Sequence, residues 1–255
     1  MSDMGVEGSD MARVRAIIVP EEPSEACAGL LDLRFSALVG AAAWSRLPAA
    51  VRARFSKRLA PDAAVTYVGT IVDSRRTLPG QWLTEFCRLI GAPLPLDADI
   101  GVPAVVTVTE DGASGGQFWT RMYGRLRGFP QVIHSSKRFA GPTGLEEYLG
   151  CGFGIALTVS TDEQALHFHS DHYFLIVGDM RLCLPRWLGP GALTISHVDQ
   201  GDERFAFVLS LVHPLFGEII RQTGIFRERP ANAACSAIRP AAPPSPAPAA
   251  SSPAG

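Results

Sequence analysis

The feature that most constrains the fold is a succession of short strand-like segments after Pro95. Each segment is about 7–12 residues long, contains alternating apolar residues, and is bounded by Gly, Pro, Asp or Ser. Connections this short join antiparallel neighbours, because a parallel neighbour needs a crossover of a dozen or more residues. The sequence from Val102 to Arg229 therefore predicts a long antiparallel meander.

The sequence before the meander has a different character. Residues 24–60 show apolar residues at helical spacing, and Pro48 separates them into two stretches. Residues 64–72 are rich in β-branched side chains and predict a strand, whereas residues 78–95 predict an amphipathic helix. We therefore expect an α+β fold. Its N-terminal helices would precede a long antiparallel β-meander that forms a curved sheet or partial barrel around a helix.

The two ends of the chain differ from its middle. Residues 230–255 contain seven Pro and ten Ala among 26 residues, with too few large apolar side chains to offset the entropy of ordering. We expect this segment to be a disordered tail, and residues 1–22 to be weakly ordered. Residues 24–229 would then form a single α+β domain.

Composition and motifs exclude several classes of function. The 23 Lys and Arg residues nearly balance the 25 Asp and Glu residues, so overall charge does not favour nucleic acid as a partner. We expect no membrane span, because no run of about 18 apolar residues occurs. The N-terminus lacks the pattern of a signal peptide, which favours a cytoplasmic location. The glycine-rich nucleotide-binding motifs and the hydrolase nucleophile motif are absent from the sequence, and we predict no cofactor. Oligomeric state is not fixed by the sequence.

One predicted strand carries a set of large polar and aromatic side chains on a single face. Trp119, Arg121 and Tyr123 alternate with Thr120 and Met122, so they share one side of the strand. Two interpretations stay open: a structural cation–π ladder, or the polar wall of a ligand pocket that holds a carboxylate or phosphate. Glu146 and Glu147 lie in a nearby strand of the meander, and one of them could pair with Arg121.

Two histidines fall on the apolar side of a predicted hairpin. His197 shares a strand face with Leu193 and Ile195, and His213 continues the apolar face of the next strand, 205–213. They could be histidines at the edge of the core that bond to the backbone. Alternatively they could line an apolar cavity, where His197 or His213 would be a candidate general base.

The segment HFHSDHYF is a weak alternative for metal binding. On one extended strand His167, His169 and Asp171 would share a face, with His172 opposite. If Ser170 and Asp171 formed a turn, His169 and His172 would instead face each other across a hairpin. The opposite face carries Leu166 and Phe168, which we expect to point into the core. The histidines would then lie on a solvated face, and we predict no metal site.

Several longer segments resemble a bacterial family known as domain of unknown function 4166. They are FWTRMYG, LEEYLG, RLCLPRWLGPGAL and RFAFVLSLVHPLFGEIIRQTGIF, preceded by FSALVGAAAWSRLPAAVRARF and YVGTIVDSR. The resemblance covers about residues 33–228. It implies an architecture and does not imply a reaction.

Three functional hypotheses follow. In the first, the sheet encloses a hydrophobic or amphipathic small molecule, such as a lipid, an isoprenoid or an aromatic compound. Trp119, Arg121, Tyr123 and either Glu146 or Glu147 would form its polar end. In the second, the protein is a cofactor-free cyclase, isomerase or hydrolase. In the third, it is an accessory partner of a separately encoded oxidoreductase.

Overall fold

A computed structural model describes residues 31–60, 63–91 and 93–230. The expectations for residues 1–22, for the first part of the helical segment 24–60 and for the tail from residue 231 lie outside this range. The helices are α1 (Arg34–Val39), α2 (Ala41–Arg46), α3 (Ala49–Phe55), α4 (Leu78–Cys87) and the short 3-10 turns η1 (Arg88–Ile90) and η2 (Arg186–Leu188).

Within the described residues, eleven strands form one continuous antiparallel sheet. They are β1 (Ala64–Arg76), β2 (Pro103–Asp111), β3 (Gly116–Tyr123), β4 (Gln131–Arg138), β5 (Glu146–Gly150), β6 (Phe153–Thr161), β7 (Ala165–Val177), β8 (Met180–Cys183), β9 (Ala192–Gly201), β10 (Arg204–His213) and β11 (Gly217–Arg229). The predicted antiparallel meander is therefore confirmed, and β8 is a strand that the sequence pattern does not predict.

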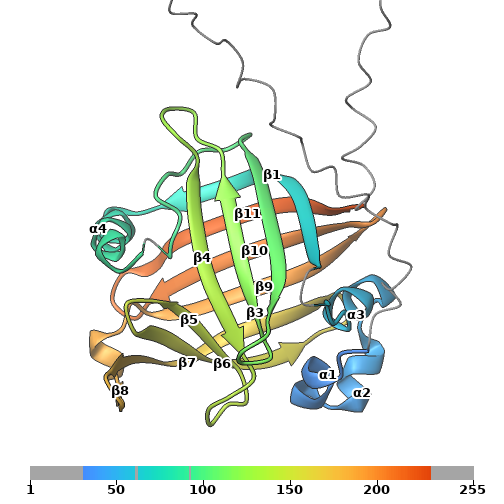
Figure 1. The fold of residues 1–255 in the computed structure, drawn as a ribbon. Coiled ribbons are helices and arrows are strands. Elements are labelled where there is room, and N and C mark those ends of the chain that lie inside the picture. Colours follow the sequence, from blue (N-terminus) through green and yellow to red (C-terminus); the bar gives the residue numbers. More distant parts are fainter. Residues whose placement is uncertain (1–30, 61–62, 92, 231–255) are drawn as a thin grey trace, which may run out of the picture.

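The sheet closes on itself. Its order is β6-β5-β4-β3-β2-β1-β11-β10-β9-β7-β8, and β6 also pairs with β7, so ten strands form a closed barrel. β8 extends β7 as a hairpin outside this ring. The structure thus goes beyond the expected curved sheet or partial barrel. The described helices lie towards the two ends of the long strands β9, β10 and β11 rather than within the ring (Figure 1), so the expectation of a helix at its centre is not confirmed.

Aromatic side chains fill the half of the barrel near α1 and α3. Phe35 of α1 contacts the rings of Phe55 and Phe168 edge-on, with ring centroids 5.2 and 6.0 Å apart. Phe226 of β11 is also buried, and a Cβ atom at Gly69 would approach its ring to 2.6 Å. A residue without a side chain at position 69 is therefore required for this aromatic packing.

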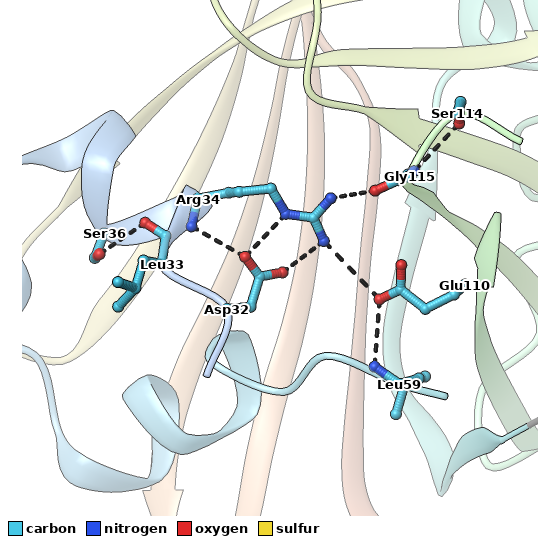
Figure 2. A network of polar contacts seen from close by, with 9 residues as sticks. Asp32, Leu33, Arg34, Ser36, Leu59, Glu110, Ser114 and Gly115 are labelled. Carbon is cyan, nitrogen blue, oxygen red and sulfur yellow. Dashed lines mark hydrogen bonds and ion pairs between the residues drawn. The ribbon is translucent and has the colours of Figure 1, made fainter. Parts of the chain in front are cut away.

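A polar network fastens the N-terminal helices to the β2–β3 hairpin (Figure 2). The Arg34 guanidinium donates to both carboxylate oxygens of buried Asp32, at 2.9 and 2.7 Å, and to the carbonyl oxygen of Gly115. It also lies 3.9 Å from Glu110, which accepts a hydrogen bond from the backbone N–H of Leu59. Residues from α1, the segment after α3 and the β2–β3 hairpin are thereby held together.

α4 begins at a local capping signal and lies at the other end of the barrel (Figure 1). The Thr77 side chain accepts a hydrogen bond from the N–H of Gly80, and a proline occupies the first turn. Cys87 is buried, yet Trp82 and Phe86 are 76% and 63% exposed, so only part of the predicted apolar face packs on the barrel. In the part of the chain that the structure describes, every helix is too short or too polar to cross a membrane.

Candidate functional site

The half of the barrel near α4 holds a cavity of about 460 Å³. Its walls are mainly apolar and come from the inward faces of β3 to β7 and β9 to β11, together with α4 and η2. Leu193, Ile195, Phe207 and Leu209 contribute to this wall from the β9–β10 hairpin. The volume is within the range of small-molecule sites in proteins, roughly 300–1,000 Å³.

The mouth of the cavity is bordered by exposed apolar side chains from three separate elements. Phe86 comes from α4, Trp187 and Leu188 come from η2, and Phe216 comes from the β10–β11 turn. Trp187 is 80% exposed, and the other three are also exposed. Clustered exposed apolar groups usually mark a binding surface. Since the side chains at the mouth are apolar, an apolar molecule can enter without desolvating many polar groups.

Deep in the cavity, charged side chains from three neighbouring strands converge. Nη2 of Arg121 on β3 lies 3.0 Å from Oε1 of Glu147 on β5. Nζ of Lys137 on β4 lies 2.6 Å from the second carboxylate oxygen of Glu147. The Ser135 hydroxyl donates to Glu147 at 2.6 Å and accepts from Arg121 at 3.1 Å. All four residues are buried, whereas only Arg121 and Glu147 line the cavity.

The surroundings of this cluster determine its charge states. Burial alone would raise the pKa of Glu147, but Lys137 and Arg121 together lower it, so the carboxylate is ionised. Burial lowers the pKa of Lys137, and the Glu147 carboxylate opposes that shift. Since Glu147 contacts the ammonium at hydrogen-bond distance, we assign Lys137 as charged at neutral pH.

The other predicted binding residues have different positions. Tyr123 lines the cavity beside Arg121, whereas Trp119 lies deeper, in the aromatic half, with its ring 5.8 Å from the Arg121 guanidinium. Glu146 is on the outer face of β5, where it pairs with Arg181 at 2.6 Å and accepts from the Tyr148 hydroxyl. The suggestion that one of the two glutamates pairs with Arg121 thus holds for Glu147, because alternation along β5 turns Glu146 outward.

His197 lies at the boundary between the packed half and the open half of the barrel. It is 2% exposed, its ring contacts Phe55, Phe205 and Phe207 at centroid distances of 5.0–5.8 Å, and Nδ1 has no hydrogen-bond partner in the described residues. Burial, followed by the charge of Arg54, lowers the pKa of His197 well below its ordinary value, so the ring is neutral. It does not line the large cavity.

His213 does line the cavity, near its mouth. Its Nδ1 accepts a hydrogen bond from the backbone N–H of Leu215 at 3.2 Å, and its ring stacks on Phe216 at 4.8 Å. Within residues 31–60, 63–91 and 93–230, neither His213 nor His197 pairs with a carboxylate. The carboxylate partner that would orient a catalytic imidazole is therefore missing from the described part of the chain.

The histidine-rich segment lies along β7 on the outside of the barrel. His167 bonds to Ser196 and Asp162, and His169 bonds to Ser160 and Thr194. The strand is continuous, so the alternative of a turn at Ser170–Asp171 is wrong. Instead a bulge leaves Asp171 unpaired, because Ala156 pairs with His172 and Leu157 pairs with Ser170. Among the described residues, no three His, Cys, Asp or Glu side chains are arranged to hold a metal ion.

Two sets of residues at the site were not predicted from the sequence. Ser135 and Lys137 share the inward face of β4 with buried Ile133, and this alternation could have identified them. Trp187 and Phe216 have no comparable signal, because they lie outside the regular strands. Their position at the mouth depends on how two distant connections meet in the folded barrel.

The fold and the cavity together define a class: a closed antiparallel barrel with an interior large enough for a small molecule. Residues 47–226 match a family described as "Domain of unknown function (DUF4166)", and the chain belongs to that family. The match confirms the resemblance seen in the sequence. A search of curated proteins and a search of solved structures each found no match.

Proposed function

We propose that this protein binds an apolar or amphipathic small molecule inside its barrel. The observation that carries the proposal is the division of the interior into two halves. One half is filled by aromatic rings, whereas the other keeps about 460 Å³ open behind an apolar mouth. A few convergent polar groups in a mainly apolar cavity are typical of small-molecule sites, where they fix the orientation of the ligand.

The enzymatic alternative has less support from the geometry. A general base needs a lone pair directed at the substrate, and usually a partner that orients the ring. His213 uses Nδ1 to accept a backbone hydrogen bond, and His197 is enclosed by aromatic rings away from the large cavity. The hypothesis of an accessory partner would need a docking surface, for which the basic residues Arg52, Arg54, Lys57 and Arg58 are candidates, yet Lys57 pairs with Glu228 at 2.5 Å. Binding is therefore the function that the described contacts favour.

The proposal can be tested with the apolar fluorophore Nile red and two matched tryptophan variants. Leu209 points into the cavity from β10, whereas Val208 is its neighbour on the outer face of the same strand. Leu209→Trp should fill part of the cavity and weaken Nile red binding by about tenfold or more, a loss of about 1.4 kcal/mol. Val208→Trp adds the same indole outside the cavity and should bind like the wild type.

The two variants distinguish dye that binds inside the cavity from dye that binds on the protein surface. A dye bound only to the surface would respond equally to both variants, and that result would contradict the proposal. Native mass spectrometry of the purified protein provides an independent measurement, since a co-purifying molecule should be lost in Leu209→Trp and kept in Val208→Trp. Wild-type protein without a bound molecule and without dye uptake would also overturn the proposal.

A further inference from the structure

The charges enclosed by the barrel do not balance. Arg121 and Lys137 contribute two positive charges and Glu147 contributes one negative charge, which leaves a net charge of +1 in the buried cluster. In the described part of the chain, Glu147 is the one acidic side chain within 4.0 Å of either cation. Glu146 pairs with Arg181 on the outer face and cannot compensate the excess.

An unbalanced buried charge is unfavourable unless something in the site compensates it. Of the two cations, Lys137 does not line the cavity; its ammonium donates to Glu147 and lies 5.1 Å from the Trp119 ring. Arg121 faces the cavity. It donates one hydrogen bond to Ser135 and one to Glu147, while a guanidinium carries five N–H donors in a planar fork. The guanidinium of Arg121 can therefore interact with a ligand in the cavity through its remaining N–H donors.

We propose that the ligand is an amphipathic monocarboxylate that enters head first, with its carboxylate against Arg121 and its hydrocarbon body towards the mouth. This inference rests on the proposed binding function and specifies its ligand class. A carboxylate supplies one negative charge and can accept two parallel N–H bonds from a guanidinium. A phosphate monoester, with about −1.5 to −2 charges at neutral pH, would overcompensate a net charge of +1. Tyr123 lines the same region and offers a phenolic hydroxyl to the head group.

The test compares molecules that share one chain and differ in the head group. Dodecanoate, dodecanol and dodecylammonium are titrated into the full-length protein at pH 7.5 by displacement of Nile red, below their micellar concentrations. The inference predicts that dodecanoate binds on the order of tenfold more tightly than dodecanol, because it gains a charge-assisted hydrogen bond. Dodecylammonium should bind more weakly than dodecanol, because it places a second unbalanced cation beside Arg121.

Two variants test whether the preference for a carboxylate head group depends on Arg121. Arg121→Gln leaves Lys137 and Glu147 as a neutral pair, so dodecanoate and dodecanol should bind with affinities within about twofold of each other. Arg75→Gln makes the same chemical change on an exposed side chain of β1 and should keep the wild-type preference. Thermal melting of each variant verifies folding.

The outcomes distinguish this inference from the function on which it rests. Equal binding of dodecanoate and dodecanol to the wild type would overturn the carboxylate assignment and leave the proposed binding function intact. Failure of all three molecules and of Nile red to bind would overturn both. A carboxylate preference that survives in Arg121→Gln would overturn the placement of the head group. If Arg121→Gln does not fold, the wild-type series alone still decides the ligand class.

Discussion

Arg121 and Glu147 are 26 positions apart in the sequence, yet their side chains lie 3.0 Å apart inside the barrel. The antiparallel register brings them together, because β3 pairs with β4 and β4 pairs with β5. Lys137 reaches the other carboxylate oxygen of Glu147 from the strand between them. Arg121 and Glu147 line the cavity and Lys137 supports Glu147 from behind, so the stability of the barrel and the chemistry of its site depend on one cluster.

Glu147→Gln should destabilise the protein much more than Lys137→Met. The first change leaves two buried cations without an anion, which is expected to cost about 3–5 kcal/mol in the free energy of unfolding. The second leaves Arg121 and Glu147 as a balanced pair, with an expected cost of about 1–2 kcal/mol. Urea denaturation of both variants measures the difference.

The double variant provides the control for this prediction. With both changes the cluster keeps the net charge of the wild type, so the double variant should be more stable than Glu147→Gln alone. Equal costs for the two single variants, together with additive behaviour in the double variant, would show that the charges do not act as a unit.

His197 should make the folded state more sensitive to mild acid. Its folded pKa is depressed, first by burial and then by Arg54, so the unfolded chain takes up a proton near pH 6.5 that the folded barrel excludes. The unfolded state then binds more protons, and stability falls with decreasing pH by up to about 1.4 kcal/mol per pH unit below pH 6.5. His197→Phe should remove this component of the pH dependence of the melting temperature.

A matched core variant separates titration from simple loss of packing. Phe35→Leu alters the same aromatic half of the barrel without contacting the imidazole, since its ring neighbours are Phe55, Phe139 and Phe168. It should lower the melting temperature at every pH and keep the acid-dependent component. If His197→Phe and the wild type show parallel curves between pH 7.5 and 5, the assignment of a neutral buried imidazole is wrong.

Arg34→Met should loosen the attachment of the N-terminal helices. The change removes both hydrogen bonds to the Asp32 carboxylate, whose side chain is 1% exposed, and the bond to the Gly115 carbonyl (Figure 2). Because a buried carboxylate loses its cation, we expect a loss of about 2 kcal/mol in the free energy of unfolding. Relative to the wild type, amide hydrogen exchange should speed up more in residues 34–55 than in β3.

Arg46→Met is the reference for that variant. Arg46 is an exposed arginine at the end of α2, so its replacement should change the stability by less than about 0.5 kcal/mol. Similar exchange rates in residues 34–55 for both variants would contradict the role assigned to the network.

Local alternation in the sequence was enough to predict most of the barrel strands and the inward face of some of them. The segment 116–123 shows why: Trp119, Arg121 and Tyr123 are buried, while Phe118 and Met122 between them are exposed. A period of two in side-chain character reports directly on the two faces of a strand. The same reasoning failed at Asp171, where a bulge changes the alternation and nothing in the local sequence marks the extra residue.

Closure of the barrel could not be derived in the same way. It depends on β1 pairing with β11, which brings residues 66–76 against residues 220–229, and on β7 pairing with β9 through residues 165–169, which bypasses β8. Strand register with a partner distant in sequence follows from packing of the whole interior, which no local pattern encodes. Both the closed ring and the placement of Trp187 and Phe216 at one cavity depend on such pairing.

The sequence by itself determined the succession of strands along the chain, the buried face of some of them, and the residue types available for a polar site. Each of these follows from properties of neighbouring residues along the chain. Only the tertiary structure decided that Glu147 rather than Glu146 meets Arg121, that Lys137 joins them, and that half of the interior stays open. The physical reason is that charge balance and cavity volume are sums over side chains from many strands, and those sums exist only once the barrel has closed.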